Sequence, residues 1–142
     1  MCRSVSEDKV FYERAFDAEV KGRLYARFHI DADGVPEFET DDDCRNYIVN
    51  LYLLSANATE IFDVTYEIDD TTDLVPIGHS TRRANDFCVS ITSSRDVPIH
   101  VGVKIGNAVY KQRAWLSNML ENGYARKSNS AIRYAINLIK YS

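Results

Sequence analysis

Apolar and polar residues alternate along most of this chain, and this period of two predicts β-strands with one buried and one solvated face. The alternation recurs in residues 23–31, 58–69, 87–92 and 97–105. Its apolar positions are Leu24, Ala26, Phe28 and Ile30, then Phe62, Val64, Tyr66 and Ile68, then Phe87, Val89 and Ile91, and finally Val97, Ile99, Val101, Val103 and Ile105. The last of these runs is the clearest strand of the chain.

Two further segments add to this pattern. Residues 46–54, NYIVNLYLL, carry apolar residues at both alternating sets of positions, which predicts a central strand with two covered faces. Gly106 and Asn107 separate the strand at 97–105 from another apolar run, and a two-residue turn that contains Gly is a hairpin signal. Residues 108–116 fit a helix as well as a strand, so both interpretations stay open.

The spacing of these segments predicts the fold class. Six or seven strands at intervals of about 10 to 20 residues, without long helical runs between them, favour a mostly β fold, an immunoglobulin-like antiparallel β-sandwich. A C-terminal α-helix is expected over about residues 128–141, because potential caps precede an amphipathic pattern there. The pattern consists of Ile132, Ala135, Ile136 and Ile139. Residues 1–142 should form one sandwich domain, in which residues 7–19 fit either a short helix or a strand.

Composition places the chain among soluble globular proteins. Hydrophobic residues make up 45% and charged residues 27%, and no apolar run approaches the length that crosses a bilayer. The N-terminal residues lack the apolar core of a signal peptide, so a cytoplasmic protein without membrane contact is expected. Cys2, Cys44 and Cys88 are an odd number without a CxxC pair, which favours reduced thiols over disulfides or a zinc site.

Charge is distributed unevenly along the chain. Residues 1–73 carry 7 Lys or Arg against 18 Asp or Glu, whereas residues 74–142 carry 10 against 3. This split can be neutralised within one fold, between the subunits of an oligomer, or by an anionic ligand on the basic half. Because the net charge is −4, double-stranded DNA is not expected as a partner.

Other residues capable of chemistry do not form a recognised motif. His29, His79 and His100 are dispersed, and His29 and His100 occupy outward strand positions, which favours surface histidines over metal ligands. DADG at residues 31–34 and the acidic run at residues 36–43 are typical of solvated turns. The nucleophile-elbow, phosphate-loop, dinucleotide and zinc-protease patterns do not occur. We therefore expect no catalytic residues, no bound metal and no cofactor, and a protein that is not an enzyme.

About residues 58–120 resemble the YEATS domain, in particular its bacterial branch. The resemblance rests on IFDVTYEIDDTTD with its Val64-Thr65-Tyr66 core and Thr71, on RDVPIHVGVKI, and on the stretch that ends at Trp115 and Leu116. It implies an immunoglobulin-like sandwich that binds its ligand through loops at one end. It also implies a non-enzymatic recognition module in a bacterial signalling or antiphage (antiviral) conflict system, with a small ligand or a protein partner.

Two loops of this chain correspond to the binding loops of that family. Their candidate ligand-binding residues are Asp69, Asp70, Thr71 and Thr72 in the first loop, and Ser94 and Arg95 in the second. Neither loop contains the aromatic ring that stacks on an acyl group in family members that read acylated lysine, so that activity does not carry over. The first loop, residues 69–73, also fits a plain solvated turn, because Asp and Thr satisfy their own backbone.

Two alternative functions use other residues. The basic half offers an anion site for a nucleotide or cyclic nucleotide, formed by Arg82, Arg83, Lys111, Arg113 and Trp115. Arginine forks bind phosphate and an aromatic ring stacks on a base. A third hypothesis is a homo-oligomer or a regulatory subunit, because the C-terminal helix, the nine tyrosines and the opposed charges suit a subunit interface.

Overall fold

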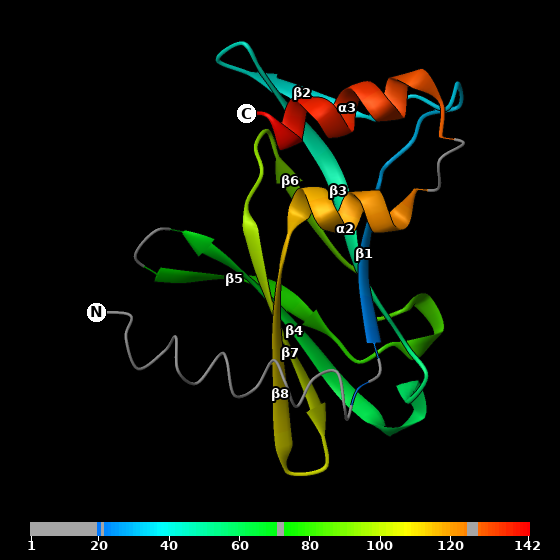
Figure 1. The fold of residues 1–142 in the computed structure, drawn as a ribbon, viewed down its shortest axis with the longest axis vertical. Coiled ribbons are helices and arrows are strands. Elements are labelled where there is room, and N and C mark those ends of the chain that lie inside the picture. The colour runs from blue at the N-terminus through cyan, green and yellow to red at the C-terminus, as the bar shows by residue number, and fades with distance from the viewer. Residues whose placement is uncertain (1–19, 21, 71–72, 125–127) are drawn as a thin grey trace.

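The computed structural model describes residue 20 and residues 22–70, 73–124 and 128–142, which form two antiparallel β-sheets and two α-helices (Figure 1). The strands are β1 (Gly22–Phe28), β2 (Phe38–Asp41), β3 (Cys44–Ser55), β4 (Ile61–Asp70), β5 (Asp73–Ser80), β6 (Val89–Ser93), β7 (Pro98–Ile105) and β8 (Ala108–Trp115). The helices are α2 (Leu116–Gly123) and α3 (Ser130–Lys140), with short 3-10 turns at η2 (Ala58–Glu60) and η3 (Arg83–Asn85).

The first sheet is built around β3. Strands β1 and β2 follow one another along one edge of β3, and β6 pairs with its other edge. The side chains of Tyr47, Val49, Leu51 and Leu53 are buried, and those between them are partly exposed. The predicted central position of residues 46–54 is therefore confirmed, because β3 has neighbours on both edges. The prediction that both of its faces are covered is wrong, since Leu54 is 54% exposed on the outer face.

The second sheet has the order β5-β4-β7-β8, with every neighbouring pair antiparallel. Strands β7 and β8 form the hairpin predicted at Gly106, whose backbone adopts a positive φ of 59°. Residues 108–115 are a strand rather than a helix, since each of them pairs with a residue of β7. The apolar face predicted for residues 97–105 points into the core, where Val97, Ile99, Val101 and Val103 are buried.

The connectivity of the two sheets is that of an immunoglobulin-like sandwich. Immunoglobulin nomenclature can be applied if β2 is set aside. Strands A, B and E are then β1, β3 and β6, and strands C, C′, F and G are β4, β5, β7 and β8. One sheet is then A-B-E and the other C′-C-F-G, which is the partition expected when C′ joins the sheet that contains C, F and G. The predicted fold class, a mostly β sandwich with a C-terminal helix, is confirmed.

Tyr66 crosses the interior between the two sheets. Its side chain is fully buried on β4, and its hydroxyl donates a hydrogen bond of 2.8 Å to the carbonyl oxygen of Phe87, just before β6. Burial raises the pKa of Tyr66 far above its usual range, so the hydroxyl stays a donor. The phenol therefore satisfies a polar group that would otherwise be buried without a partner.

Helix α2 covers the edge of β1 that β3 leaves open. Gly123, at the end of the helix, lies so close to β1 that an added Cβ would be 1.9 Å from the carbonyl oxygen of Ala26. Asn122 donates a 2.9 Å hydrogen bond to the carbonyl of Leu24, and the backbone N–H of Phe28 donates one of 2.9 Å to the Tyr124 hydroxyl. An exposed strand edge invites pairing with other chains, and α2 covers this one.

Helix α3 confirms the predicted C-terminal helix, with bounds slightly shorter than residues 128–141. The side chain of Asn129 caps its first turn by accepting a 2.8 Å hydrogen bond from the backbone N–H of Ile132. Its buried side chains are the four residues expected from the helical pattern, Ile132, Ala135, Ile136 and Ile139. Neither helix of the described residues is long and apolar enough to cross a membrane.

Three elements were not predicted, and each depends on distant parts of the chain. Strand β2 is fully exposed and acidic, and it forms by pairing with β3 across a left-handed turn at Asp42 and Asp43. Strand β5 contains Pro76, which is tolerated because β5 lies at the edge of its sheet. Helix α2 begins where the Asp96 carboxylate accepts hydrogen bonds from the backbone N–H and the hydroxyl of Ser117.

Four smaller predictions about single residues are wrong. Ile30 was expected on the buried face of the first strand, but it lies beyond the end of β1 and is 38% exposed. Phe62 is 53% exposed, because a β-bulge between Ile61 and Asp63 turns Ile61 rather than Phe62 toward the core. Phe87 is buried but precedes β6, in a left-handed backbone conformation rather than in a strand. His100 lies on the outer face of β7 but is only 7% exposed, since β7 is an internal strand with neighbours on both sides. The interpretations of residues 7–19 fall outside the described residues.

Candidate functional site

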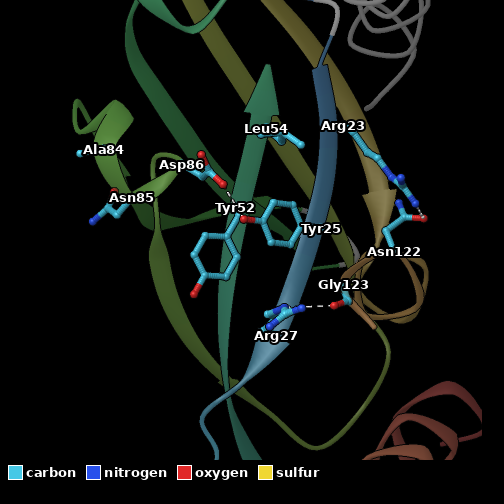
Figure 2. Close-up of a pocket in the computed structure, with 10 residues that line it drawn as sticks. All are labelled: Arg23, Tyr25, Arg27, Tyr52, Leu54, Ala84, Asn85, Asp86, Asn122 and Gly123. Carbon is cyan, nitrogen blue, oxygen red and sulfur yellow. Dashed lines mark hydrogen bonds between the residues drawn. The ribbon is translucent and has the colours of Figure 1, made fainter. Parts of the chain in front are cut away.

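An open hollow of about 530 Å³ lies on the outer face of the first sheet, and we call it the Arg–Tyr hollow (Figure 2). The side chains that give it its chemistry are Arg23, Tyr25, Arg27, Tyr52, Leu54 and Asp86. Residues of η3 and the last residues of α2 complete its rim. A volume of this size is within the range of small-molecule sites.

The hollow results from alternation along β1. Arg23, Tyr25 and Arg27 occupy successive outward positions, so two guanidinium groups flank one phenol ring. The register of β1 and β3 sets Tyr25 directly opposite Tyr52. Their rings stack with centroids 4.7 Å apart and planes inclined by 11°. The floor of the hollow is therefore an aromatic pair with a cationic residue on each side along β1.

A strained turn between η3 and β6 forms one wall of the hollow. Asp86 and Phe87 have φ angles of 55° and 54°, in the left-handed region that non-glycine residues rarely adopt. Tyr25 donates a 2.5 Å hydrogen bond to the Asp86 carboxylate, and the backbone N–H of Leu53 donates one of 2.9 Å to the Asp86 carbonyl. Strain of this kind persists only where surrounding contacts hold it, and it occurs often at functional sites.

The two phenols of the hollow are neutral at physiological pH. Burial, followed by the hydrogen bond to the Asp86 carboxylate, raises the pKa of Tyr25 far above its usual range. Burial is also the main cause that raises the pKa of Tyr52. The charges in the hollow are consequently those of Arg23, Arg27 and Asp86.

Both arginines are held by neutral groups rather than by carboxylates. Arg23 donates a 3.3 Å hydrogen bond to the side-chain oxygen of Asn122, and Arg27 donates one of 3.0 Å to the carbonyl of Gly123. The Arg27 guanidinium also lies 5.3 Å from the centre of the Tyr124 ring. Within the described part of the chain, no carboxylate forms an ion pair with either side chain. The guanidinium groups are positioned while their charge remains available to a ligand.

The candidate ligand-binding loops that the sequence predicted lie away from the Arg–Tyr hollow. Ser94 and Arg95 line a smaller cleft of about 250 Å³ together with Ile68 and Val75 of the β4–β5 hairpin. The structure thus brings the second loop next to the hairpin that carries the first, as the resemblance implies. Thr71 and Thr72 fall outside the described residues, so the role of these loops stays a prediction.

The assignment of Asp69 and Asp70 to a loop is wrong. Both residues belong to β4, and the backbone of Asp70 pairs with that of Asp73 in β5, so these three residues belong to paired strands. The carboxylate of Asp69 lies 3.2 Å from Nε2 of His100. The strand continues this far because β5 pairs with it up to Asp70, whereas the pairing with β7 ends at Ile68.

The alternative anion-binding residues lie on separate elements. Arg82 and Arg83 are exposed in the β5–β6 connection, where Arg83 donates a 3.1 Å hydrogen bond to the Thr59 carbonyl. Lys111, Arg113 and Trp115 share the outward face of β8 in the second sheet. The sequence suggested one site from these five residues, whereas the structure divides them between two elements.

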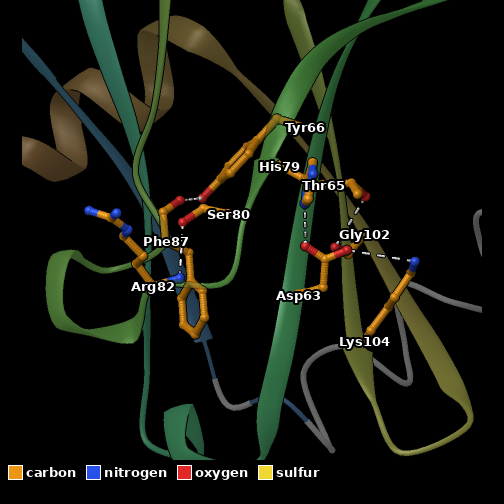
Figure 3. Close-up of polar contacts among 9 residues, drawn as sticks. All are labelled: Asp63, Thr65, Tyr66, His79, Ser80, Arg82, Phe87, Gly102 and Lys104. Carbon is orange, nitrogen blue, oxygen red and sulfur yellow. Dashed lines mark hydrogen bonds and ion pairs between the residues drawn. The ribbon is translucent and has the colours of Figure 1, made fainter.

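Three polar side chains on the outer face of the second sheet meet at Asp63 (Figure 3). Asp63 lies 2.8 Å from Nδ1 of His79 and 3.6 Å from the Lys104 ammonium group. The hydroxyl of Thr65 donates a 3.4 Å hydrogen bond to the carbonyl of Gly102 on the neighbouring strand. Over the described ranges, no cluster of three His, Cys, Asp or Glu residues has the arrangement to hold a metal ion.

The sequence analysis did not nominate the Arg–Tyr hollow. Its signal was present in residues 23–27, where the outward positions read Arg, Tyr and Arg, but alternation was used there to find the buried face. Comparison of the chain with protein-family models, with curated proteins and with solved structures finds no match. The resemblance to the YEATS domain therefore stays a prediction from the residues that carry it.

Proposed function

We propose that this protein is a non-enzymatic recognition module that binds a nucleotide in the Arg–Tyr hollow. The observation that carries the proposal is the placement of Arg23 and Arg27, which flank the stacked tyrosines while their hydrogen bonds go to neutral acceptors. Two fixed cations beside an aromatic floor match a ligand with an anionic group and a planar ring.

The dimensions of the hollow suit a mononucleotide. Arg23 and Arg27 are four residues apart on one strand, so their Cα atoms are separated by about 13 Å. A ligand of that length can place a phosphate on one arginine and its base near Tyr25 and Tyr52. Asn85 and Asn122 at the rim supply amide groups for the edge of a base or for sugar hydroxyls.

The position of Asp86 predicts the orientation of a nucleotide in the hollow. Its carboxylate accepts the hydrogen bond from Tyr25 and lies on the η3 wall, whereas Arg23 and Arg27 contact the α2 wall. A phosphate is repelled from the first wall and attracted to the second. The nucleotide is therefore expected to bind with its phosphate toward α2 and its base toward η3.

This proposal differs from the earlier hypotheses in the place of the site. A ligand-sensing role agrees with the resemblance to bacterial YEATS domains, in which binding would occur at the loops. Nucleotide binding was suggested for Arg82, Arg83 and the outward residues of β8. The proposed site instead uses the face of the first sheet, in the acidic half of the chain.

Thermal unfolding with and without ligand tests the proposal. A panel of purine and pyrimidine mononucleotides should raise the melting temperature, and the matching nucleosides or inorganic phosphate alone should raise it less, because a ligand of the folded state stabilises it. Arg27→Gln should weaken binding about tenfold or more, the loss expected for one charge-assisted hydrogen bond. Arg113→Gln, an exposed arginine on β8, is the matched control and should bind as the wild type does. Equal shifts in the two variants would refute the site.

A further inference from the structure

A second surface of the molecule is formed by α3 and the elements next to it. Helix α3 buries Ile132, Ala135, Ile136 and Ile139, yet its opposite side also carries large apolar residues. Tyr134, Leu138 and Tyr141 follow one another at helical spacing and are 55%, 37% and 76% exposed. A helix that is apolar on both sides is expected to be covered on both, and among the described residues this side of α3 has no covering neighbour.

Aromatic residues from other elements extend this side of α3. Phe38 of β2 and Trp115 at the end of β8 are 39% and 48% exposed. A hollow of about 400 Å³ separates α3 from the β2–β3 turn, and one of about 310 Å³ lies beside Trp115, with Tyr141 lining both. We call the surface made by Phe38, Arg45, Trp115, Tyr134, Leu138 and Tyr141 the C-terminal aromatic face.

Arg45 links the aromatic residues of this face. Its guanidinium lies 4.5 Å from the centre of the Phe38 ring and 5.6 Å from that of Tyr134. Exposed tyrosine, tryptophan and arginine side chains carry much of the binding energy of protein interfaces. The composition of the face is therefore that of a docking surface.

The charges around the face indicate what covers it. Arg45 lies within it, Lys140 lies beside Trp115 and Tyr141 at its border, and the exposed turn Asp41–Asp43 lies at its rim. In the described part of the chain, the carboxylates of the turn form no ion pair, and the two cations contact only a phenol hydroxyl and aromatic rings. One patch thus contains both signs of charge, and none of these charges has a carboxylate–cation partner among the residues that the structure describes.

We propose that the C-terminal aromatic face binds a second copy of this chain in a two-fold symmetric dimer. A two-fold interface brings a patch against itself and so requires self-complementarity, which a patch with uncompensated charges of both signs provides. Arg45 of each copy faces the Asp41–Asp43 turn of the other. The aromatic residues between these charges form the buried centre of the interface.

Sedimentation velocity over a range of protein and salt concentrations tests the dimer. The wild type should change from monomer to dimer as its concentration rises, and salt should weaken the association. Tyr134→Ser with Leu138→Ser should remove the dimer, with circular dichroism to show that the fold is kept. A wild type that is monomeric up to about 1 mM would overturn the proposal.

A charge exchange tests the two-fold arrangement itself. Arg45→Glu and Asp41→Lys should each weaken self-association about tenfold or more, because each variant sets like charges against one another. An equimolar mixture of the two should form a heterodimer, since one native ion pair and one ion pair of opposite sense can then form across the interface. Arg82→Glu, an equal charge change at an exposed arginine away from the face, should dimerise as the wild type does. If the mixture associates no better than either variant alone, the arrangement is wrong.

Discussion

The first sheet turns arginines and tyrosines outward, whereas the second sheet turns outward acidic, histidine and lysine side chains that pair with one another. On the first face, Arg23 and Arg27 are held by an amide and a carbonyl oxygen. On the second, Asp63 is shared by His79 and Lys104. Both faces carry formal charge, but Arg23 and Arg27 meet no carboxylate among the described residues, whereas Asp63 on the second face has two charged or titratable neighbours.

This difference separates a structural face from a binding face. A charge that already has an opposite partner gains little from a ligand, because binding would first have to break the pair. A guanidinium positioned by neutral acceptors keeps its full attraction for an anion and has lost much of its side-chain freedom before the ligand arrives. The first face is therefore the preorganised one.

The same comparison explains the uneven charge along the sequence. Asp63 and Asp69 of the acidic half meet Lys104 and His100 of the basic half, so β4 and β7 neutralise part of the split within the fold. The Asp41–Asp43 turn finds no such partner among the described residues and stays exposed. Within the described residues, the Lys104–Asp63 pair is an ion pair between the two halves of the chain, and how the rest of the split is neutralised stays a prediction.

The largest losses of stability and of nucleotide binding are expected when the contact between α2 and β1, which supports the first face, is disrupted. Gly123→Ala places a methyl group where the carbonyl oxygen of Ala26 is 1.9 Å away, so α2 must move off β1. The free energy of unfolding should fall by about 3 kcal/mol, and nucleotide binding should be lost with the α2 wall.

Chemical denaturation measures this loss, and Gly78→Ala is the control. The added methyl at residue 78 meets only a side-chain atom of Val89, at 3.3 Å, which can move. The control should change stability by less than half as much. Equal losses in both variants would mean that the contact between α2 and β1 does not support the face.

The next largest loss of stability is expected at the turn that forms the η3 wall. Tyr66→Phe removes the hydrogen bond to the Phe87 carbonyl and leaves that buried oxygen without a donor, which costs about 1–3 kcal/mol. Urea unfolding should show this loss together with weaker nucleotide binding, because Asp86 adjoins Phe87. Tyr134→Phe, at an exposed tyrosine, should change stability by less than about 0.5 kcal/mol. A Tyr66 variant as stable as this control would contradict the role given to the hydrogen bond.

A pH titration can separate the buried phenols of the first face from the rest of the molecule. The pKa of Tyr25 is raised in the folded chain by burial and by Asp86, while in the unfolded chain it is about 10. Below pH 10 both states keep the proton and stability is unaffected by this group. Above it the unfolded chain loses the proton first, so the stability falls as pH rises.

Urea unfolding between about pH 8 and pH 11 should record this fall. Tyr25→Phe removes the group that titrates and should make the dependence on pH less steep above pH 10. The same steepness in the variant and the wild type would show that Tyr25 is not held neutral in the hollow.

The smallest changes in stability and nucleotide binding are expected from a substitution on the second face. Lys104→Gln removes one partner of Asp63 but leaves His79 in place, and the lysine is 42% exposed. Exposed ion pairs contribute little, so the stability should change by less than about 1 kcal/mol and nucleotide binding should not change. A loss of binding as large as that caused by Arg27→Gln would show that the two faces are not independent.

Much of the fold could be predicted because it depends on local periodicity. Alternation located β1, β3, β4, β6 and β7, and the helical pattern located α3 behind the potential caps at residues 128–130, of which Asn129 is the one used. The turn at Gly106 indicated a hairpin, but its second arm, β8, stayed open between strand and helix. The elements that were not predicted depend on contacts far along the chain. Helix α2 is capped by a carboxylate from 21 residues earlier, and β5 is a strand because β4 pairs with it.

The sequence by itself determined which residues alternate, and hence that two apolar faces exist and that Arg23, Tyr25 and Arg27 point to the same side. Only the tertiary structure decided that Tyr52 lies opposite Tyr25, that the η3 turn and the end of α2 enclose them, and that no described carboxylate neutralises the arginines. The reason is that side-chain direction follows from the local backbone. Strand register and the packing of distant segments depend instead on the whole set of core contacts.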